Sequence, residues 1–148
     1  MRTLAIDLGE RRVGLAISDE GATLATPHEV LQVNSSADAT VPIIKLIATE
    51  GIKRVLLGLP LNMDNTLGPA AKKTIEWGRH LAASAGIEVI YVDERLSSFE
   101  AEQQLNSRKR AGEKLTRARK KRQLDALAAA SILQAFLDGK LPPISLDL

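Results

Sequence analysis

The 148-residue chain contains no cysteine, so it can form neither a disulfide nor a thiolate metal site. It also lacks a long apolar run, because no segment approaches the roughly 20 residues that an α-helix needs to cross a bilayer. The first residues, MRTLAIDLGE, acquire acidic side chains too early for the apolar region of a secretory signal. We therefore expect a cytoplasmic protein that makes no membrane contact.

The remaining composition is that of an ordinary globular protein, with 45% hydrophobic and 26% charged residues. A chain of this length typically folds as one domain and buries a sizeable core. We expect a single domain over residues 1–138, followed by an irregular tail over residues 139–148 that begins at Gly139 and contains LPPISLDL.

Positive charge is concentrated in one segment, although the formal net charge is only +2. Between Ser107 and Gln123, nine of the twenty basic residues accompany a single acid, Glu113. The rest of the chain therefore holds eleven basic and seventeen acidic residues, a balance of minus six. Such asymmetry favours a polyanionic partner. A solvated charged loop that leads into a helix is the alternative interpretation of this segment.

Apolar patterning and turn residues predict alternating strands and helices. The expected strands cover residues 2–8, 13–18, 28–33, 52–60 and 87–96. The expected helices cover residues 39–50, 69–86, 97–105 and 116–137. Three strands in an antiparallel meander, followed by two parallel strands with right-handed crossovers, form one mixed five-stranded sheet flanked by helices. This is the element order of the ribonuclease-H-like α/β fold.

Three acidic residues stand where this fold brings chain segments together. Asp7 lies near the end of the first strand, and Glu94 follows the fifth strand, so parallel strands would present both beyond their carboxyl ends. Asp125 shares a helical stripe with Ala129 and Ile132, which should face the sheet. Gathered carboxylates repel one another and are costly to desolvate, and a divalent cation compensates them. Hard oxygen ligands suit Mg²⁺ or Mn²⁺.

Each acid also has a simpler explanation when it is taken alone. Asp7 can cap the turn that follows it, and Glu94 can belong to an exposed strand end with a local ion pair. Asp125 can pair with Arg119 or Arg122. The combination of all three, on the first strand, the fifth strand and the last helix, favours a catalytic, metal-binding site.

Four motifs resemble a known family when they are taken together. They are AIDLGERRVGLAISD, LGLPLNMDNTLGP, VDERLSSFEAE and LDALAAASILQAFLD, in this order along nearly the whole chain. They are similar to the YqgF-type family, described both as Holliday junction resolvases and as nucleases that mature the precursor of small-subunit ribosomal RNA. Two positions depart from the usual pattern. Asn65 replaces a common glycine and keeps tolerance of a positive φ, and Ser97-Ser98 replaces a pair of threonines.

The resemblance implies metal-dependent hydrolysis of phosphodiester bonds, with Asp7, Glu94 and Asp125 as catalytic and metal-binding residues. In such a site, metal ions activate water and stabilise the leaving oxygen. We expect arginines near the acids to bind phosphate and the basic segment to follow a nucleic acid backbone. The expected nucleic-acid-binding residues are Arg11, Arg12, Arg95, Arg108, Lys109, Arg110, Arg117, Arg119, Lys120, Lys121 and Arg122. Stacking on bases should be minor, because aromatic residues make up only 3% of the chain.

Several alternatives remain open at the level of sequence. The opening hairpin also resembles the phosphate-binding hairpin of actin-like kinases, but the chain has neither their length nor their second phosphate motif. A non-catalytic RNA-binding factor of ribosome assembly would keep the basic segment without needing the three acids. The substrate can be a branched DNA junction or a structured precursor RNA, free or within a ribosomal precursor particle. A resolvase that makes paired cuts would act as a homodimer, whereas an RNA-processing enzyme can act as a monomer.

Overall fold

A five-stranded mixed sheet organises the chain in the computed structural model, which describes residues 1–95 and 117–146, with the side chains of the last helix described from residue 124 onward. Its elements are β1 (Thr3–Leu8), β2 (Arg12–Ser18), β3 (Ala25–Gln32), the 3-10 turn η1 (Ser36–Ala39), α1 (Thr40–Glu50), β4 (Arg54–Leu59), α2 (Pro69–Ala85), β5 (Glu88–Asp93) and α4 (Arg117–Leu137).

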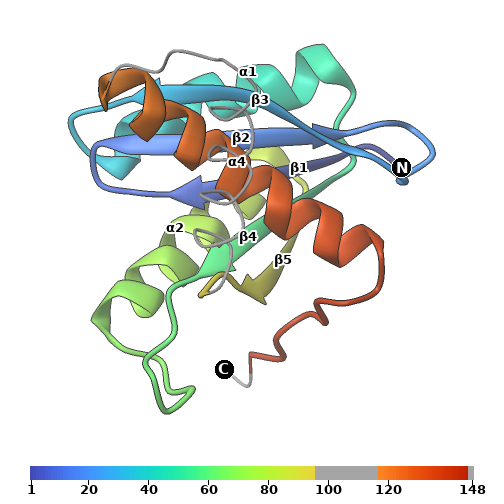
Figure 1. Cartoon of the computed structure of the whole chain (residues 1–148). Helices are drawn as coiled ribbons and strands as arrows, with labels where there is room; N and C mark the ends of the chain where they lie inside the picture. The colour runs from blue at the N-terminus through green and yellow to red at the C-terminus, as the bar shows by residue number, and fades with distance from the viewer. Residues whose placement is uncertain (96–116, 147–148) are drawn as a thin grey trace.

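The strand order is β3-β2-β1-β4-β5, and it confirms the predicted topology. β1, β2 and β3 form an antiparallel meander, while β4 pairs in parallel with β1 and β5 in parallel with β4 (Figure 1). β1, β4 and β5 therefore end at the same edge of the sheet. The predicted helix over residues 97–105 lies outside the described residues.

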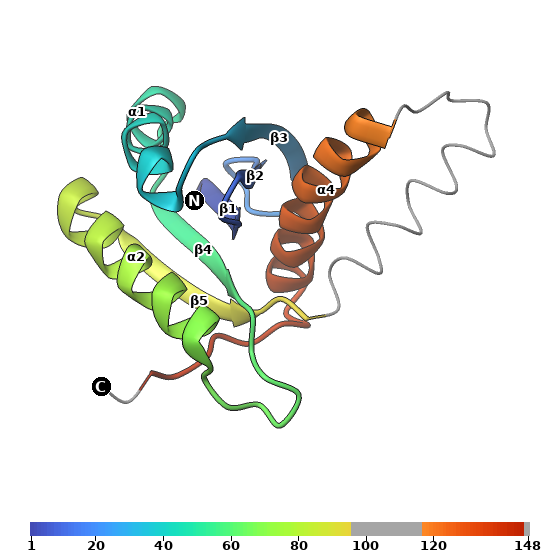
Figure 2. The same ribbon diagram turned by 90° about the vertical axis from the view of Figure 1, so that its left-hand side faces the viewer.

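Helices cover the two faces of the sheet unequally. Figure 2 shows α1 and α2 on one face and α4 on the other, so the domain has three layers. Side chains in β1 alternate between these layers. Leu4 and Ile6 join the cluster under α1 and α2, whereas Ala5 packs on the α4 side with Ala129 and Leu133. By the same alternation, Asp7 belongs to the α4 face.

Local sequence signals account for the helix ends. Pro69 begins α2, where its missing N–H is not needed. Gly51 and Gly86 end α1 and α2 with φ values of 64° and 62°, which glycine adopts without strain. The predicted helices over residues 39–50 and 69–86 are thus confirmed almost to the residue, while a 3-10 turn precedes the first of them.

After α4, residues 139–146 form neither helix nor strand and return to the outer edge of β5. There the Ile144 N–H donates to the Tyr91 carbonyl at 2.7 Å.

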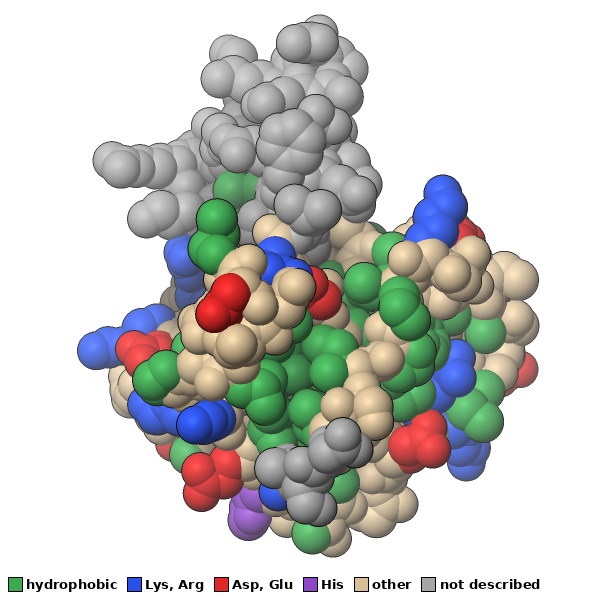
Figure 3. Space-filling model, turned by 90° about the horizontal axis from the view of Figure 1, so that it is seen from below, with side chains coloured by type: hydrophobic (Ala, Val, Ile, Leu, Met, Phe, Trp, Pro, Cys, Tyr) green, Lys and Arg blue, Asp and Glu red, His purple; other side chains and the backbone are tan. Residues whose placement is uncertain are grey.

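Figure 3 shows hydrophobic side chains gathered in the middle of the lower face of the molecule, with charged side chains around its margin. Among the helices that the structure describes, none has both the length and the apolar character that crossing a bilayer requires.

Candidate active site

Asp7 stands where β1 leaves the core and faces α4. Its direct partner in β2 is Gly14, which has no side chain above the sheet. The backbone of α4 uses this space, because a Cβ on Gly14 would lie 2.1 Å from the backbone oxygen of Asp125. The glycine thus lets α4 approach β2 closely and brings Asp125 beside Asp7.

Glu94 reaches the same face from the end of β5. The Glu94 N–H donates to the Leu59 carbonyl at 3.3 Å, which holds the residue after β5 against the end of β4. A Cβ on Gly58 would lie 2.7 Å from the Glu94 Oε2 atom, so a second strand glycine leaves room for this carboxyl group. The carboxyl group therefore lies over β4 and turns toward Asp7, with which it forms a hydrogen bond.

Burial and proximity change the acidity of this pair. Burial raises the pKa of Asp7, while its hydrogen bond with Glu94 lowers it. Burial and the nearby Asp7 charge raise the pKa of Glu94 to about 9. The raised pKa of Glu94 favours its protonated form, in which it donates a hydrogen bond to the Asp7 carboxylate. In that form the two carboxyl groups carry one negative charge between them.

Asp125 completes the acidic site from α4. The predicted stripe on this helix is confirmed, because Ala129 and Ile132 are buried against the sheet. Burial raises the pKa of Asp125, the Arg12 charge lowers it, and the Asp7 charge raises it. The Arg12 Nε atom lies 3.0 Å from Asp125 Oδ2, so a guanidinium from β2 neutralises the third acid. The sequence did not reveal Arg12 as this partner.

A pocket opens in front of Asp7 and Asp125. It has a volume of about 480 Å³ and is lined by Asp7, Gly9, Glu10, Arg11, Arg12 and Asp125. Arg11 and Arg12 also line a neighbouring hollow of about 670 Å³ between the end of β3 and the start of α1. Two of the predicted phosphate-binding arginines therefore lie between the acids and an adjoining groove.

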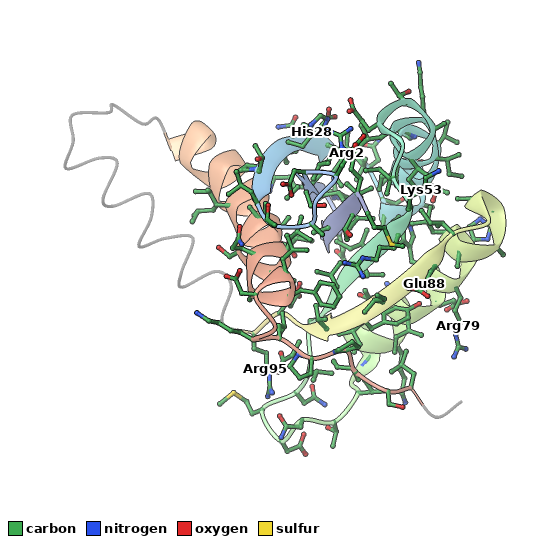
Figure 4. The ribbon with its side chains drawn as sticks, turned by 90° about the vertical axis from the view of Figure 1, so that its right-hand side faces the viewer. Arg2, His28, Lys53, Arg79, Glu88 and Arg95 are labelled. Carbon is green, nitrogen blue, oxygen red and sulfur yellow. The ribbon has the colours of Figure 1, made fainter. Side chains whose placement is uncertain are left out.

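Arg95 lies differently from Arg11 and Arg12. Its Nη2 atom is 2.6 Å from Asp93 Oδ2, and its Nη1 atom donates to the Asn62 carbonyl at 2.9 Å. Figure 4 shows Arg95 at the end of β5 beside the loop that joins β4 to α2. The simpler interpretation of an ion pair at a strand end therefore applies to Asp93 and Arg95, while Glu94 between them turns into the acidic site.

The donor set fits a hard divalent cation by its chemistry, since Asp7 and Asp125 line one pocket, Glu94 is hydrogen-bonded to Asp7, and two strand glycines make room for the close approach. Their arrangement is not that of an assembled metal centre. Among the side chains that the structure describes, no three acidic or histidine groups are placed to hold an ion together. Asp7 and Glu94 share a proton, and Asp125 is paired with Arg12.

Most of the predicted basic segment cannot be placed at the site. Arg108, Lys109 and Arg110 lie outside the described residues. The helical backbone of α4 includes the positions of the other five predicted residues, but their side chains are outside the described part of the chain: Arg117, Arg119, Lys120, Lys121 and Arg122.

The fold and the acidic site define a protein of the ribonuclease-H-like class. RuvC from T. thermophilus, solved in complex with a Holliday junction substrate, matches with a TM-score of 0.58 and 18% identity over 97% of this chain and 100% of that one. The Fowlpox virus resolvase, solved with Holliday junction DNA, matches with a TM-score of 0.56 and 10% identity over 94% of this chain and 98% of that one. At these identities the similarity is one of fold.

Sequence comparison identifies the family. Residues 1–139 match the family described as "RuvX: Holliday junction resolvase". A relative from Anaeromyxobacter dehalogenans, named "Putative pre-16S rRNA nuclease", is 40% identical over 142 residues, which are 96% of this chain and 100% of the relative. A relative of the same name from Syntrophomonas wolfei is 40% identical over 94% of this chain and 95% of its own length. The chain belongs to the RuvX family, also called the YqgF-type family, as its four motifs predict. This membership assigns the opening hairpin to a RuvX-type protein rather than to an actin-like kinase.

Proposed function

We propose that the protein is a metal-dependent nuclease that hydrolyses phosphodiester bonds in structured nucleic acid, and that its substrate is the 5′ end of the precursor of 16S ribosomal RNA. The observation that carries this proposal is the convergence of three acids from distant segments: Glu94 is hydrogen-bonded to Asp7, and Asp7 and Asp125 line one pocket. The names of the relatives support the choice of ribosomal RNA. That substrate places the protein in the bacterial cytoplasm.

In this proposal, Asp7, Glu94 and Asp125 hold Mg²⁺ or Mn²⁺. The bound metal would supply Lewis-acid activation of water and stabilisation of the leaving oxygen. Glu94 must first release the proton that it shares with Asp7, and Asp125 must separate from Arg12. In this proposal, metal binding therefore displaces a proton from Glu94 and the Arg12 guanidinium from Asp125.

Arg11 in the β1–β2 turn and Arg12 at the start of β2 supply the phosphate contacts. Arg11 and Arg12 line both the acidic pocket and the hollow next to it. A guanidinium group binds phosphate oxygens with paired hydrogen bonds. Once it leaves Asp125, Arg12 is free to contact the phosphate next to the bond that is cut. The basic residues at 108–122 would extend this contact along the backbone.

Cleavage of branched DNA is the second candidate function. It is favoured by the family description and by the shared fold with RuvC. A resolvase would need two copies of the site to make paired cuts, whereas cleavage of an RNA end needs one. Binding without cleavage, as an assembly factor, would need no acidic site.

The deciding experiment compares the wild-type protein with Asp7→Asn on end-labelled precursor ribosomal RNA and on a four-way DNA junction, in Mg²⁺, in Mn²⁺ and in chelator. Asp138→Asn makes the same change at an exposed position after α4 and serves as the control. We expect metal-dependent cleavage of the RNA that is lost in Asp7→Asn and kept in Asp138→Asn. Cleavage of the junction alone would select the resolvase, and binding without any cleavage would select the assembly factor.

A further inference from the structure

The loop between β4 and α2, residues 60–68, is closed by its own hydrogen bonds. The Asn62 N–H donates to the Thr66 carbonyl at 3.0 Å, and the Asn65 N–H donates to the Asn62 carbonyl at 2.9 Å. Asn65 adopts a φ of 69°, a conformation that asparagine tolerates better than most residues. The loop thus presents a backbone carbonyl and the Asn65 side chain toward the end of β5.

Arg95 connects this loop to β5. Its Nε atom donates to both carboxylate oxygens of Asp93 at 3.0 Å, its Nη1 atom donates to the Asn62 carbonyl, and its Nη2 atom donates to Asp93 and to the Asn65 Oδ1 atom. One donor on Nε, one on Nη1 and both on Nη2 are engaged, which leaves one of the five guanidinium N–H groups for other partners. A phosphate clamp needs two parallel donors, so Arg95 does not offer one in this arrangement.

The backbone of Glu94 is tethered on both sides. On one side, its N–H is bonded to the Leu59 carbonyl at the end of β4. On the other side, the next residue is Arg95, which is bonded to the loop that leaves β4. The Glu94 side chain packs directly over Gly58, where a Cβ would lie 2.7 Å from Glu94 Oε2 and 2.9 Å from Glu94 Cβ.

We propose that Arg95 is a positioning residue, which acts through Asn62 and Asn65 to hold Glu94 in the acidic site rather than by binding phosphate. This inference rests on the proposed function, because it assigns Arg95 a part in the same site. The proposed contact also gives the Asn65 side chain a role that a glycine at this position could not fill. Both residues permit the left-handed backbone, but only asparagine offers an oxygen to Arg95.

Three variants test this role at the two ends of the contact. Asn65→Gly keeps the backbone conformation and removes the oxygen, while Asn65→Asp keeps an oxygen at the same place. Arg95→Gln removes the guanidinium. Arg79→Gln is the control, because Arg79 lies on α2 next to Glu88 at the opposite end of β5 (Figure 4).

Two measurements are made on each variant. The first is kcat and KM for the nucleic acid substrate. The second is hydrogen exchange of the Glu94 amide, which needs no enzymatic activity. We expect Arg95→Gln to lower kcat about 10- to 100-fold, the usual range for a residue that orients a metal ligand, with little change in KM. Asn65→Gly should also lower kcat, but to a smaller extent. In both Arg95→Gln and Asn65→Gly, the Glu94 amide should lose its protection against hydrogen exchange. Asn65→Asp should keep wild-type values.

A phosphate-binding role gives a different pattern. Arg95→Gln would then raise KM with kcat unchanged, Asn65→Gly would bind substrate as well as or better than wild type, and the Glu94 amide would stay protected. That pattern would overturn the proposal. If the wild-type protein cuts no nucleic acid, the proposed function fails, while the exchange measurement still decides whether Arg95 and Asn65 hold Glu94 in place.

Discussion

The shared proton at the acidic site makes the stability of the protein depend on pH in a way that one substitution should remove. Glu94 has a pKa of about 9 in the folded chain, against 4.5 for a solvated glutamate. Between these two values, the folded state binds a proton that the unfolded state has released. Stability must therefore fall as the pH rises through this window, since the folded state binds more protons.

The size of this effect follows from one proton. Within this window, each rise of one pH unit lowers the free energy of unfolding by about 1.4 kcal/mol. For a chain of this length, that corresponds to a decrease in Tm of about 4 °C per pH unit. The slope of the free energy of unfolding against pH does not depend on the exact limits of the window. It can therefore be measured well within these limits, from about pH 6 to about pH 8.

Glu94→Gln is the perturbation that isolates this proton. Glutamine occupies the space over Gly58 and can donate an N–H to Asp7, but it does not titrate. Urea unfolding of both proteins without divalent metal should show wild-type stability declining against the variant by about 1.4 kcal/mol per pH unit. Glu88→Gln, at the exposed first residue of the same strand, should keep the wild-type slope. Equal slopes for wild type and Glu94→Gln would refute the shared proton.

Three further perturbations test the site and its surroundings. Asp7→Asn should leave the fold as stable as wild type or more so, because it removes a charge from an acidic site; a large loss of Tm in thermal unfolding would contradict this. Gly14→Ala places a Cβ against the α4 backbone and should cost about 1–3 kcal/mol in urea unfolding, whereas Gly21→Ala, where the nearest atom is 3.6 Å away, should cost less. Neutralising the four basic residues at 119–122 should weaken nucleic acid binding and flatten the plot of log affinity against log salt by up to about four units. Unchanged affinity would identify that segment as a solvated surface.

Most of the fold could be predicted because it is encoded in local patterns. Leu4, Ala5 and Ile6 form a continuous apolar run, which is typical of a strand that is covered on both faces. The predicted start of the third strand at residue 28 is wrong, since β3 begins at Ala25. Its first residues are largely exposed and carry no apolar alternation. Backbone pairing with β2, which side chains do not encode, sets that boundary.

The acidic residues could be predicted, but their partners could not. Asp125 was found from the apolar stripe on its helix, a local signal. Its pairing with Arg12 and the use of Arg95 as a link to the β4–α2 loop depend on contacts between distant segments. In the sequence, Gly14 and Gly58 are the signal for the close approach of Asp125 and Glu94, because glycine inside a strand often marks a close approach of another backbone or side chain.

The position of α4 across the sheet has a consequence for synthesis of the chain. This helix packs on β1, β2 and β3, and its Gln134 side chain accepts a bond from the Ala25 N–H, 109 residues earlier in the chain. Because translation proceeds from the N-terminus, Asp7 is made long before Asp125. A nascent chain on the ribosome holds the five strands of the sheet, α1 and α2 before it has the third acid. The acidic site is therefore complete only after α4 has been made and has packed on the sheet.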